Sequence, residues 1–122
     1  MILIVEDERL NCFILKSFLE LHGYKTLIAE NGAIALNVLM ENQDISLVLL
    51  DLNMPVMNGY EFLQELSNNE TYKNLKPEVI IISTVDKISF EMEKKHREIN
   101  TGLIKAYLSK PIDLPKLLTL TS

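Results

Sequence analysis

The sequence predicts an α/β fold in which a five-stranded parallel sheet carries helices on both faces. Short apolar runs alternate with helix-like stretches five times along the 122 residues, and this alternation is typical of a parallel sheet with right-handed crossovers. Four of the runs are mainly apolar, as expected of strands buried on both faces. The run at residues 24–29 mixes polar and apolar residues and therefore belongs at an edge. This favours the flavodoxin-like doubly wound order 2-1-3-4-5.

The first half of the chain predicts three strands and the two helices between them. Strands are expected at residues 2–5, 24–29 and 45–50. Asp7 and Glu8 open the first helix, because acids stabilise helix N-termini, and Gly23 ends it. Asn31 caps the second helix. At helical spacing, the residues expected to face the core are Leu10, Ile14, Phe18 and Leu21, followed by Ala33, Leu36, Leu39 and Met40.

The second half predicts three helices and two strands. The third helix begins at Gly59 or Tyr60, and a polar loop covers residues 68–77. Strands are expected at 79–82 and 103–108, with a helix from about 86 to 99 between them. Asp113 caps a short final helix. The predicted core faces of these helices are Leu63 and Leu66, then Ile88, Met92 and Ile99, then Leu114, Leu117 and Leu118, and His96 is expected to be partly buried beside Met92.

Composition narrows the class of protein. The length suits one domain spanning 1–122, and the short final helix is also consistent with excision from a longer protein. A net charge of −5 argues against direct nucleic-acid binding. The single cysteine, Cys12, forms no internal disulfide and fits a reducing cytoplasm as a small buried residue. The apolar runs are too short to cross a membrane, and Glu6, Asp7 and Glu8 interrupt the first one before it could act as a signal peptide.

Charged and polar residues follow the strands that converge in this topology. Glu6 and Asp7 follow the first strand, Asp51 the third, Ser83 and Thr84 the fourth, and Lys110 the fifth. Two like charges about 4 Å apart repel by about 4 kcal/mol at an effective dielectric of 20. One carboxylate must therefore take up a proton, or a cation must bind. Oxygen ligands suit Mg²⁺ or Mn²⁺, and the backbone carbonyl of Asn53 could add a ligand. The alternative is that these are unrelated surface acids and that Asp51 only caps the turn after its strand.

Taken in order, these segments resemble the receiver domain of two-component response regulators. The resemblance runs from Ile2 to about Leu118, and no single motif is specific without the others. The motifs are Ile4-Val5-Glu6-Asp7, Leu50-Asp51-Leu52-Asn53-Met54-Pro55, Met57-Asn58-Gly59, Ser83, and Tyr107-Leu108-Ser109-Lys110-Pro111.

The resemblance implies a role for each matching residue. Asp51 would accept a phosphoryl group from the phosphohistidine of a histidine kinase or phosphotransfer protein, and would signal to a downstream output protein or domain. Mg²⁺ would be held by Glu6, Asp7, Asp51 and the Asn53 carbonyl. Lys110 would contact the phosphoryl oxygens and Ser83 would hydrogen-bond one of them. Tyr107 would be the aromatic switch residue, against the alternative of a half-buried tyrosine whose hydroxyl lies in water. The Lys110–Pro111 peptide bond would be cis.

The sequence also departs from the family pattern. Thr84 stands where receivers usually carry Ala or Gly, so it either crowds the site or shifts the hydroxyl assignment by one; Ser83 is preferred. Ser83 and Lys110 lie 27 positions apart, a few more than is typical, which leaves the mode of dimerisation open. Val85 is apolar where a polar residue could orient water, so slow hydrolysis of the phosphoryl bond is expected.

Three other functions compete with this interpretation. A haloacid-dehalogenase-type phosphatase also places an Asp nucleophile at a strand end, but needs a second acid where this chain has Asn53. A flavodoxin needs a phosphate loop rich in Ser, Thr and Gly after the first strand, where this chain has acids. A degenerate receiver that serves only as a binding surface would have little reason to keep Glu6, Asp7, Asp51 and Lys110 together.

Overall fold

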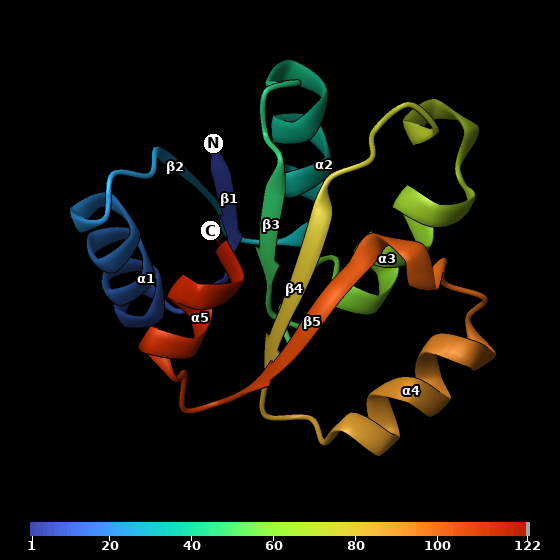
Figure 1. Ribbon diagram of the computed structural model, residues 1–122. Helices are drawn as coiled ribbons and strands as arrows, with labels where there is room; N and C mark the ends of the chain where they lie inside the picture. Colours follow the sequence, from blue (N-terminus) through green and yellow to red (C-terminus); the bar gives the residue numbers. More distant parts are fainter. Residues whose placement is uncertain (122) are drawn as a thin grey trace.

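The computed structural model describes residues 1–121, and these form a parallel sheet with the order β2-β1-β3-β4-β5 (Figure 1). Strands and helices alternate along the chain, so the predicted fold class and strand order are confirmed. The strands are β1 (Ile2–Val5), β2 (Thr26–Ala29), β3 (Leu47–Leu50), β4 (Glu78–Ser83) and β5 (Ile104–Ser109). The helices are α1 (Arg9–Leu21), α2 (Gly32–Glu41), α3 (Gly59–Asn68), α4 (Lys87–His96) and α5 (Leu114–Thr121).

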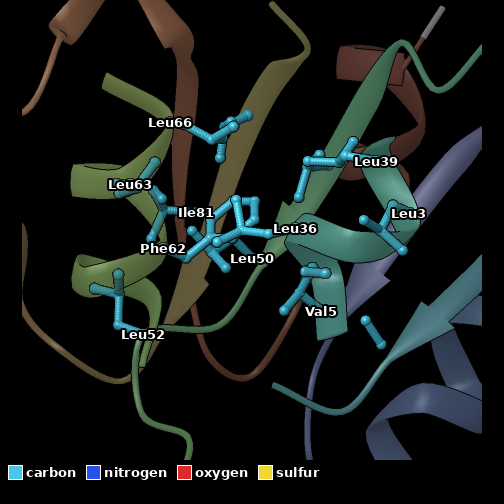
Figure 2. Close-up of a cluster of buried hydrophobic side chains, with 14 of the residues drawn as sticks. Leu3, Val5, Leu36, Leu39, Leu50, Leu52, Phe62, Leu63, Leu66 and Ile81 are labelled. Atoms are coloured by element: carbon cyan, nitrogen blue, oxygen red, sulfur yellow. The ribbon is translucent and has the colours of Figure 1, made fainter. Parts of the chain in front are cut away.

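Successive residues of each strand point to opposite faces of the sheet, and this divides the core in two. Leu3, Val5, Val48 and Leu50 pack with α2 and α3 on one face. Figure 2 shows three of these side chains, Leu3, Val5 and Leu50, in close-up. Ile2, Ile4, Leu47 and Leu49 pack with α1 and α5 on the other face. Both faces of the central strands are therefore buried, and polar side chains on these strands are confined to their ends.

Several strand ends differ from the prediction by one or two residues. β2 begins at Thr26 instead of residue 24. Tyr24 lies outside the sheet, and its hydroxyl donates to the carbonyl oxygen of Thr121 at 3.0 Å. β3 begins at Leu47 instead of residue 45. β4 and β5 both reach one residue further, since Ser83 pairs with Ser109. The loop predicted at 68–77 contains a 3₁₀ turn at Glu70–Tyr72, and a second such turn, Thr101–Leu103, precedes β5.

The predicted core face of α1 is wrong. Leu10, Ile14 and Leu21 are 61%, 39% and 81% exposed, and Phe18 is only partly buried. The buried residues are Cys12, Leu15 and Leu19. Apolar residues occupy more than one side of this helix, so periodicity cannot choose between the sides. The short connection from β1 fixes which side of α1 faces the core. It places Cys12 where its thiol donates to the carbonyl oxygen of Glu6 at 3.3 Å.

The other helices confirm part of their predicted faces. Leu36, Leu39, Leu63, Leu66 and Leu117 are buried, as predicted, while Leu114 and Leu118 are partly buried. In α2, Met40 is exposed and Ala33 is only partly buried; Ala35 takes their place.

The prediction for α4 is wrong in its face and its end. Ile88 and Met92 are 75% and 69% exposed, and His96 is exposed as well. Phe90, which is 1% exposed, is the buried residue of this helix. Ile99 is buried as predicted but lies beyond the end of the helix. One aromatic ring outweighs two aliphatic side chains here, because Phe90 meets two tyrosine rings from neighbouring elements.

No helix within residues 1–121 is both long enough and apolar enough to span a membrane.

Candidate functional site

Three carboxylates meet at the C-terminal edge of the sheet. Glu6 and Asp7 follow β1, and Asp51 follows β3, the strand beside it. One oxygen from each of the three lies within 4.8 Å of the others. Glu6 is 3% exposed and Asp51 is 7% exposed, whereas Asp7 is open to solvent. The predicted convergence of these acids is therefore found, with two of them buried and one at the rim.

Lys110 lies between the two buried acids. Its Nζ is 2.9 Å from Oε1 of Glu6 and 3.4 Å from Oδ2 of Asp51. The lysine is brought here by the end of β5, where its N–H donates to the carbonyl oxygen of Ser83 at 2.9 Å. The peptide bond that follows it, to Pro111, is cis, as the resemblance implied. One ammonium thus contacts two of the three carboxylates, and the site is net negative when all three are ionised.

Burial and this charge imbalance together shift the pKa values of the buried pair. Burial, reinforced by the neighbouring Glu6 carboxylate, raises the pKa of Asp51 from 3.8 to about 6, although Lys110 and the Asn53 N–H oppose the rise. Burial also disfavours the charged form of Glu6, but hydrogen bonds with Lys110, Asp51 and Asn11 outweigh it and lower its pKa. Burial lowers and the two acids raise the pKa of Lys110, with a net rise. At neutral pH the ionised form of Asp51 is therefore disfavoured, first by burial and then by the Glu6 carboxylate.

The loop after β3 fixes the position of Asp51. The N–H of Asn53 donates to Oδ1 of Asp51 at 3.4 Å, and Leu52 and Met54 are buried beneath the loop. Gly59 closes it, since a Cβ on Gly59 would lie 2.5 Å from the carbonyl oxygen of Asp51. The Asn53 carbonyl as a metal ligand stays a prediction.

The chain after Gly59 is held by a capping box at the start of α3. Asn58 Oδ1 accepts the N–H of Glu61 at 2.9 Å, and the Glu61 carboxylate accepts the N–H of Asn58 at 3.0 Å. These two bonds satisfy donors that a helix start otherwise leaves free. The helix start therefore anchors the loop that carries Asp51.

Ser83 and Thr84 differ in burial. Ser83 is fully buried at the end of β4, and its Oγ accepts the N–H of Val85 at 3.0 Å. Thr84 is exposed. The serine therefore lies at the edge of the sheet between β3 and β5, whereas the threonine points to solvent, and this arrangement favours Ser83 as the hydroxyl of the site.

Tyr107 lies on β5 opposite Ile81. The residue as a whole is partly exposed, but its hydroxyl oxygen is buried and has no hydrogen-bond partner among the described residues. Burial raises the pKa of Tyr107, and the neighbouring Ser83 side chain partly offsets the rise. The alternative of a hydroxyl in water is therefore wrong for this structure.

Sequence reasoning missed two residues near the site. Asn11 donates from Nδ2 to Oε1 of Glu6 at 2.9 Å, and Phe90 packs against Tyr107 with the ring centroids 5.2 Å apart. Asn11 lies on α1 five positions after Glu6, and this spacing is not a recognisable sequence motif. The burial of Phe90 could have been inferred only by preferring its ring to Ile88 and Met92.

The acid cluster fits a hard divalent cation. Mg²⁺ binds in proteins through one or two carboxylates and keeps several waters, and Mn²⁺ accepts the same oxygen ligands. Glu6, Asp7 and Asp51 supply such oxygens, with Asp7 exposed on the side open to water. The chemistry of this donor set therefore fits either ion.

Comparisons with known proteins agree with one another. The family model described as "Response regulator receiver domain" matches residues 2–122. The polar-differentiation response regulator DivK of Brucella anthropi is 30% identical over 115 residues, which cover 94% of this chain and 87% of DivK. DivK of Brucella abortus is 30% identical over the same length.

Solved structures show the same fold. A response regulator receiver protein from Pseudomonas putida superposes with a TM-score of 0.82 and 25% identity, covering 98% of this chain and 93% of that one. The chemotaxis protein CheY4 of Vibrio cholerae, at 24% identity and a TM-score of 0.79, covers the same shares and supports the fold alone. The phosphatase and flavodoxin alternatives are not favoured. With its acid cluster and lysine at the carboxyl edge of a 2-1-3-4-5 sheet, the chain belongs to the receiver domains of two-component response regulators.

Proposed function

We propose that Asp51 is the phosphoacceptor of this receiver, and that it takes its phosphoryl group from the phosphohistidine of a histidine kinase or phosphotransfer protein. The observation that carries the proposal is the placement of Lys110, within 3.4 Å of an Asp51 oxygen and 2.9 Å of a Glu6 oxygen. A single cation between two buried acids is suited to receiving a further anionic group, because phosphoryl transfer depends mainly on alignment and charge neutralisation.

The transfer exchanges one bond to phosphorus for another. An ionised oxygen of Asp51 attacks phosphorus, and an O–P bond forms as the N–P bond to the donor imidazole breaks. The electron pair of that N–P bond stays on the leaving imidazole nitrogen, and the imidazole takes up a proton from water. With a pKa of about 6, Asp51 is ionised at neutral pH and can act as the nucleophile. Lys110 then faces the new phosphoryl oxygens as a point charge.

A divalent cation would complete the neutralisation. Glu6, Asp7 and Asp51, with the Asn53 carbonyl, would hold Mg²⁺ or Mn²⁺. When bound, the ion supplies positive charge against the phosphoryl oxygens. The chain's own residues contribute the rest: Lys110 balances part of the charge, and the N–H of Asn53 orients Asp51.

The output of the proposed modification is a conformational switch. A phosphoryl group adds charge and three strong acceptor oxygens, and the Ser83 hydroxyl would donate to one of them. Ser83 now accepts from the N–H of Val85, so its movement would shift the start of the loop to α4. Tyr107 would respond to that shift, and the altered surface would signal to an output protein or domain.

Intact mass after incubation with acetyl phosphate and Mg²⁺ tests the proposal. One added phosphoryl group is expected, and it should be absent in Asp51→Asn. Asp44→Asn is the matched control, since Asp44 is an exposed aspartate away from the site, and it should be labelled like the wild type. Continuous release of phosphate from many substrates would instead support a phosphatase. No label at all would support a receiver that acts only as a binding surface.

The lifetime of the aspartyl phosphate follows from Val85. This side chain is partly buried beside Ser83 and offers no polar group to orient an attacking water. The phosphoryl group is therefore expected to hydrolyse slowly, and Val85→Gln to speed its loss. A mass time course measures this, and disappearance of the label within seconds in the wild type would contradict the reasoning.

A further inference from the structure

Three aromatic rings run from the neighbourhood of the site to α3. Tyr107 on β5 packs against Phe90 on α4, with the ring centroids 5.2 Å apart, and Phe90 stacks on Tyr60 of α3 at 6.0 Å. The guanidinium of Arg97 lies over the other end, 5.1 Å from the centre of the Tyr60 ring. We call Tyr107, Phe90 and Tyr60 the aromatic row. It joins three elements that are distant in the sequence.

Phe90 is the central member of the aromatic row and anchors α4 in the core. It is 1% exposed, and no other residue within Lys87–His96 is buried. Protein interiors are close-packed, so a displacement of Tyr107 would remove one wall of the Phe90 pocket. The cavity left would be unfavourable, and Phe90 would have to follow. Because α4 has no second buried side chain to hold it back, the helix would follow as well.

Arg97, which directly follows α4, ties the end of that helix to α3. Its Nη1 donates to Oε1 of Gln64 at 2.8 Å, and its Nε donates to Oε1 of Glu93 at 2.5 Å. The residues that follow make the same connection, since the N–H of Asn100 donates to Oγ of Ser67 at 2.9 Å. A movement of α4 would therefore be transmitted to α3 through Arg97. The contact between the Phe90 and Tyr60 rings links the same two helices.

The other end of the aromatic row is poised to move. The buried hydroxyl of Tyr107 has no hydrogen-bond partner among residues 1–121, and leaving a buried polar group without a partner is unfavourable. Ser83 is its polar neighbour and is also the residue proposed to meet the phosphoryl group. A change in Ser83 would thus alter the surroundings of the buried Tyr107 hydroxyl at this end of the aromatic row.

We infer that Arg97 is a positioning residue that couples α3 to the switch, acting through the aromatic row on Tyr107. The inference rests on the proposed phosphorylation of Asp51. It adds α3, including the surface around Gln64, to the part of the molecule that changes when the site is loaded.

The test uses ¹⁵N-labelled protein saturated with Mg²⁺ and beryllium fluoride, a stable mimic of the aspartyl phosphate. In the wild type, amide signals of Asn53 and Ser83 report loading of the site, and those of Tyr60 and Gln64 are expected to shift with them. In Arg97→Ala the first two should still shift, whereas the α3 signals should lose their response.

Lys95→Ala is the matched control, because it removes a positive charge from an exposed position two residues away on the same stretch of chain; its α3 signals should respond as in the wild type. Phe90→Leu removes the central ring of the aromatic row and is expected to cause the same loss of the α3 response as Arg97→Ala. It therefore keeps the inference testable if Arg97→Ala fails to fold. A full α3 response in both variants, or none in a loaded wild type, would overturn the inference alone. If Asn53 and Ser83 do not respond either, the phosphoacceptor proposal fails and the inference with it.

Discussion

Replacing Asp51 by asparagine should make the metal-free protein more stable, although it removes the proposed phosphoacceptor. An asparagine side chain has nearly the shape of a protonated aspartate, so the substitution keeps the packing of the site while removing one of its two buried negative charges. Glu6 would then share Lys110 with no second buried acid. The cost of burying the Asp51 charge, increased by the Glu6 carboxylate, is thus predicted to appear as a gain in the free energy of unfolding of the variant.

The size of the gain follows from the pKa of Asp51. Raising the pKa of this buried carboxyl from 3.8 to about 6 costs the folded state about 3 kcal/mol at neutral pH. Below pH 3.8 the group is protonated in both the folded and unfolded states, and the cost is absent. Between 3.8 and about 6 only the unfolded state has released the proton, so stability falls as the pH rises. Above about 6 the whole cost applies.

Urea unfolding at pH 7.5 in EDTA measures the free energy of unfolding of the wild type and of Asp51→Asn. We expect the value for the variant to be higher by about 3 kcal/mol, which corresponds to a rise in Tm of roughly 10 °C. At pH 4 the two proteins should be nearly equal. Millimolar Mg²⁺ should raise the Tm of the wild type by relieving the same repulsion, and should raise that of the variant less.

Asp44→Asn provides the control for the chemical change itself, and its stability should stay within about 0.5 kcal/mol of the wild type because it is a surface substitution. If Asp51→Asn is equal to or less stable than the wild type at pH 7.5 without metal, the ionised form of Asp51 is not disfavoured in the folded protein, and the reasoning is refuted. Absence of any Mg²⁺ effect on the wild type would count equally against the metal site.

Three further predictions concern the scaffold, and each is checked by thermal or urea unfolding. Val56 is 82% exposed with φ at 70°, a left-handed conformation that is unfavourable for a β-branched residue, so Val56→Gly should stabilise the protein by about 1 kcal/mol; a loss of stability would show that the loop is not strained there. Gly59→Ala should destabilise by about 2 kcal/mol or more, since the added Cβ would meet the carbonyl oxygen of Asp51 at 2.5 Å, and it should also slow labelling of Asp51. Leu19→Ala should cost about 3 kcal/mol and Leu21→Ala about 0.5 kcal/mol or less, because Leu19 is buried and Leu21 is 81% exposed; the reverse order would restore the face first predicted for α1.

The strands and their order could be predicted because each depends on a local property. A run such as Val79–Ile82 is apolar throughout, and only a strand buried on both faces needs that pattern. The meeting of Glu6, Asp51 and Lys110 follows from the same step, since parallel strands bring their carboxyl ends to one edge. The site was therefore predictable from topology, before any contact was known.

The faces of α1 and α4 were not predictable in this way. Both helices carry apolar residues on more than one side, and the choice between Leu19 and Leu21, or between Phe90 and Met92, is made by what the rest of the fold presents. The buried hydroxyl of Tyr107 is a further case, because Tyr107 packs against a ring contributed by α4. Such features arise from tertiary packing and leave no local pattern.

The unfavourable free energy of the ionised, buried acids would be offset by a ligand that neutralises them in the folded protein. Glu6, Asp7 and Asp51 against Lys110 leave an excess of negative charge when all are ionised. About 3 kcal/mol of strain is tolerable in a domain of ordinary stability, for which 5–15 kcal/mol is typical, since β1 and β3 are buried along their whole length beneath the acids. A divalent cation that binds only the folded site relieves that strain, and the relief adds to its affinity. Filling the site with apolar residues would stabilise the fold but remove this coupling. The proposed response to a cation, and through the cation to a phosphoryl group, would therefore draw on the same unfavourable charges that weaken the free domain.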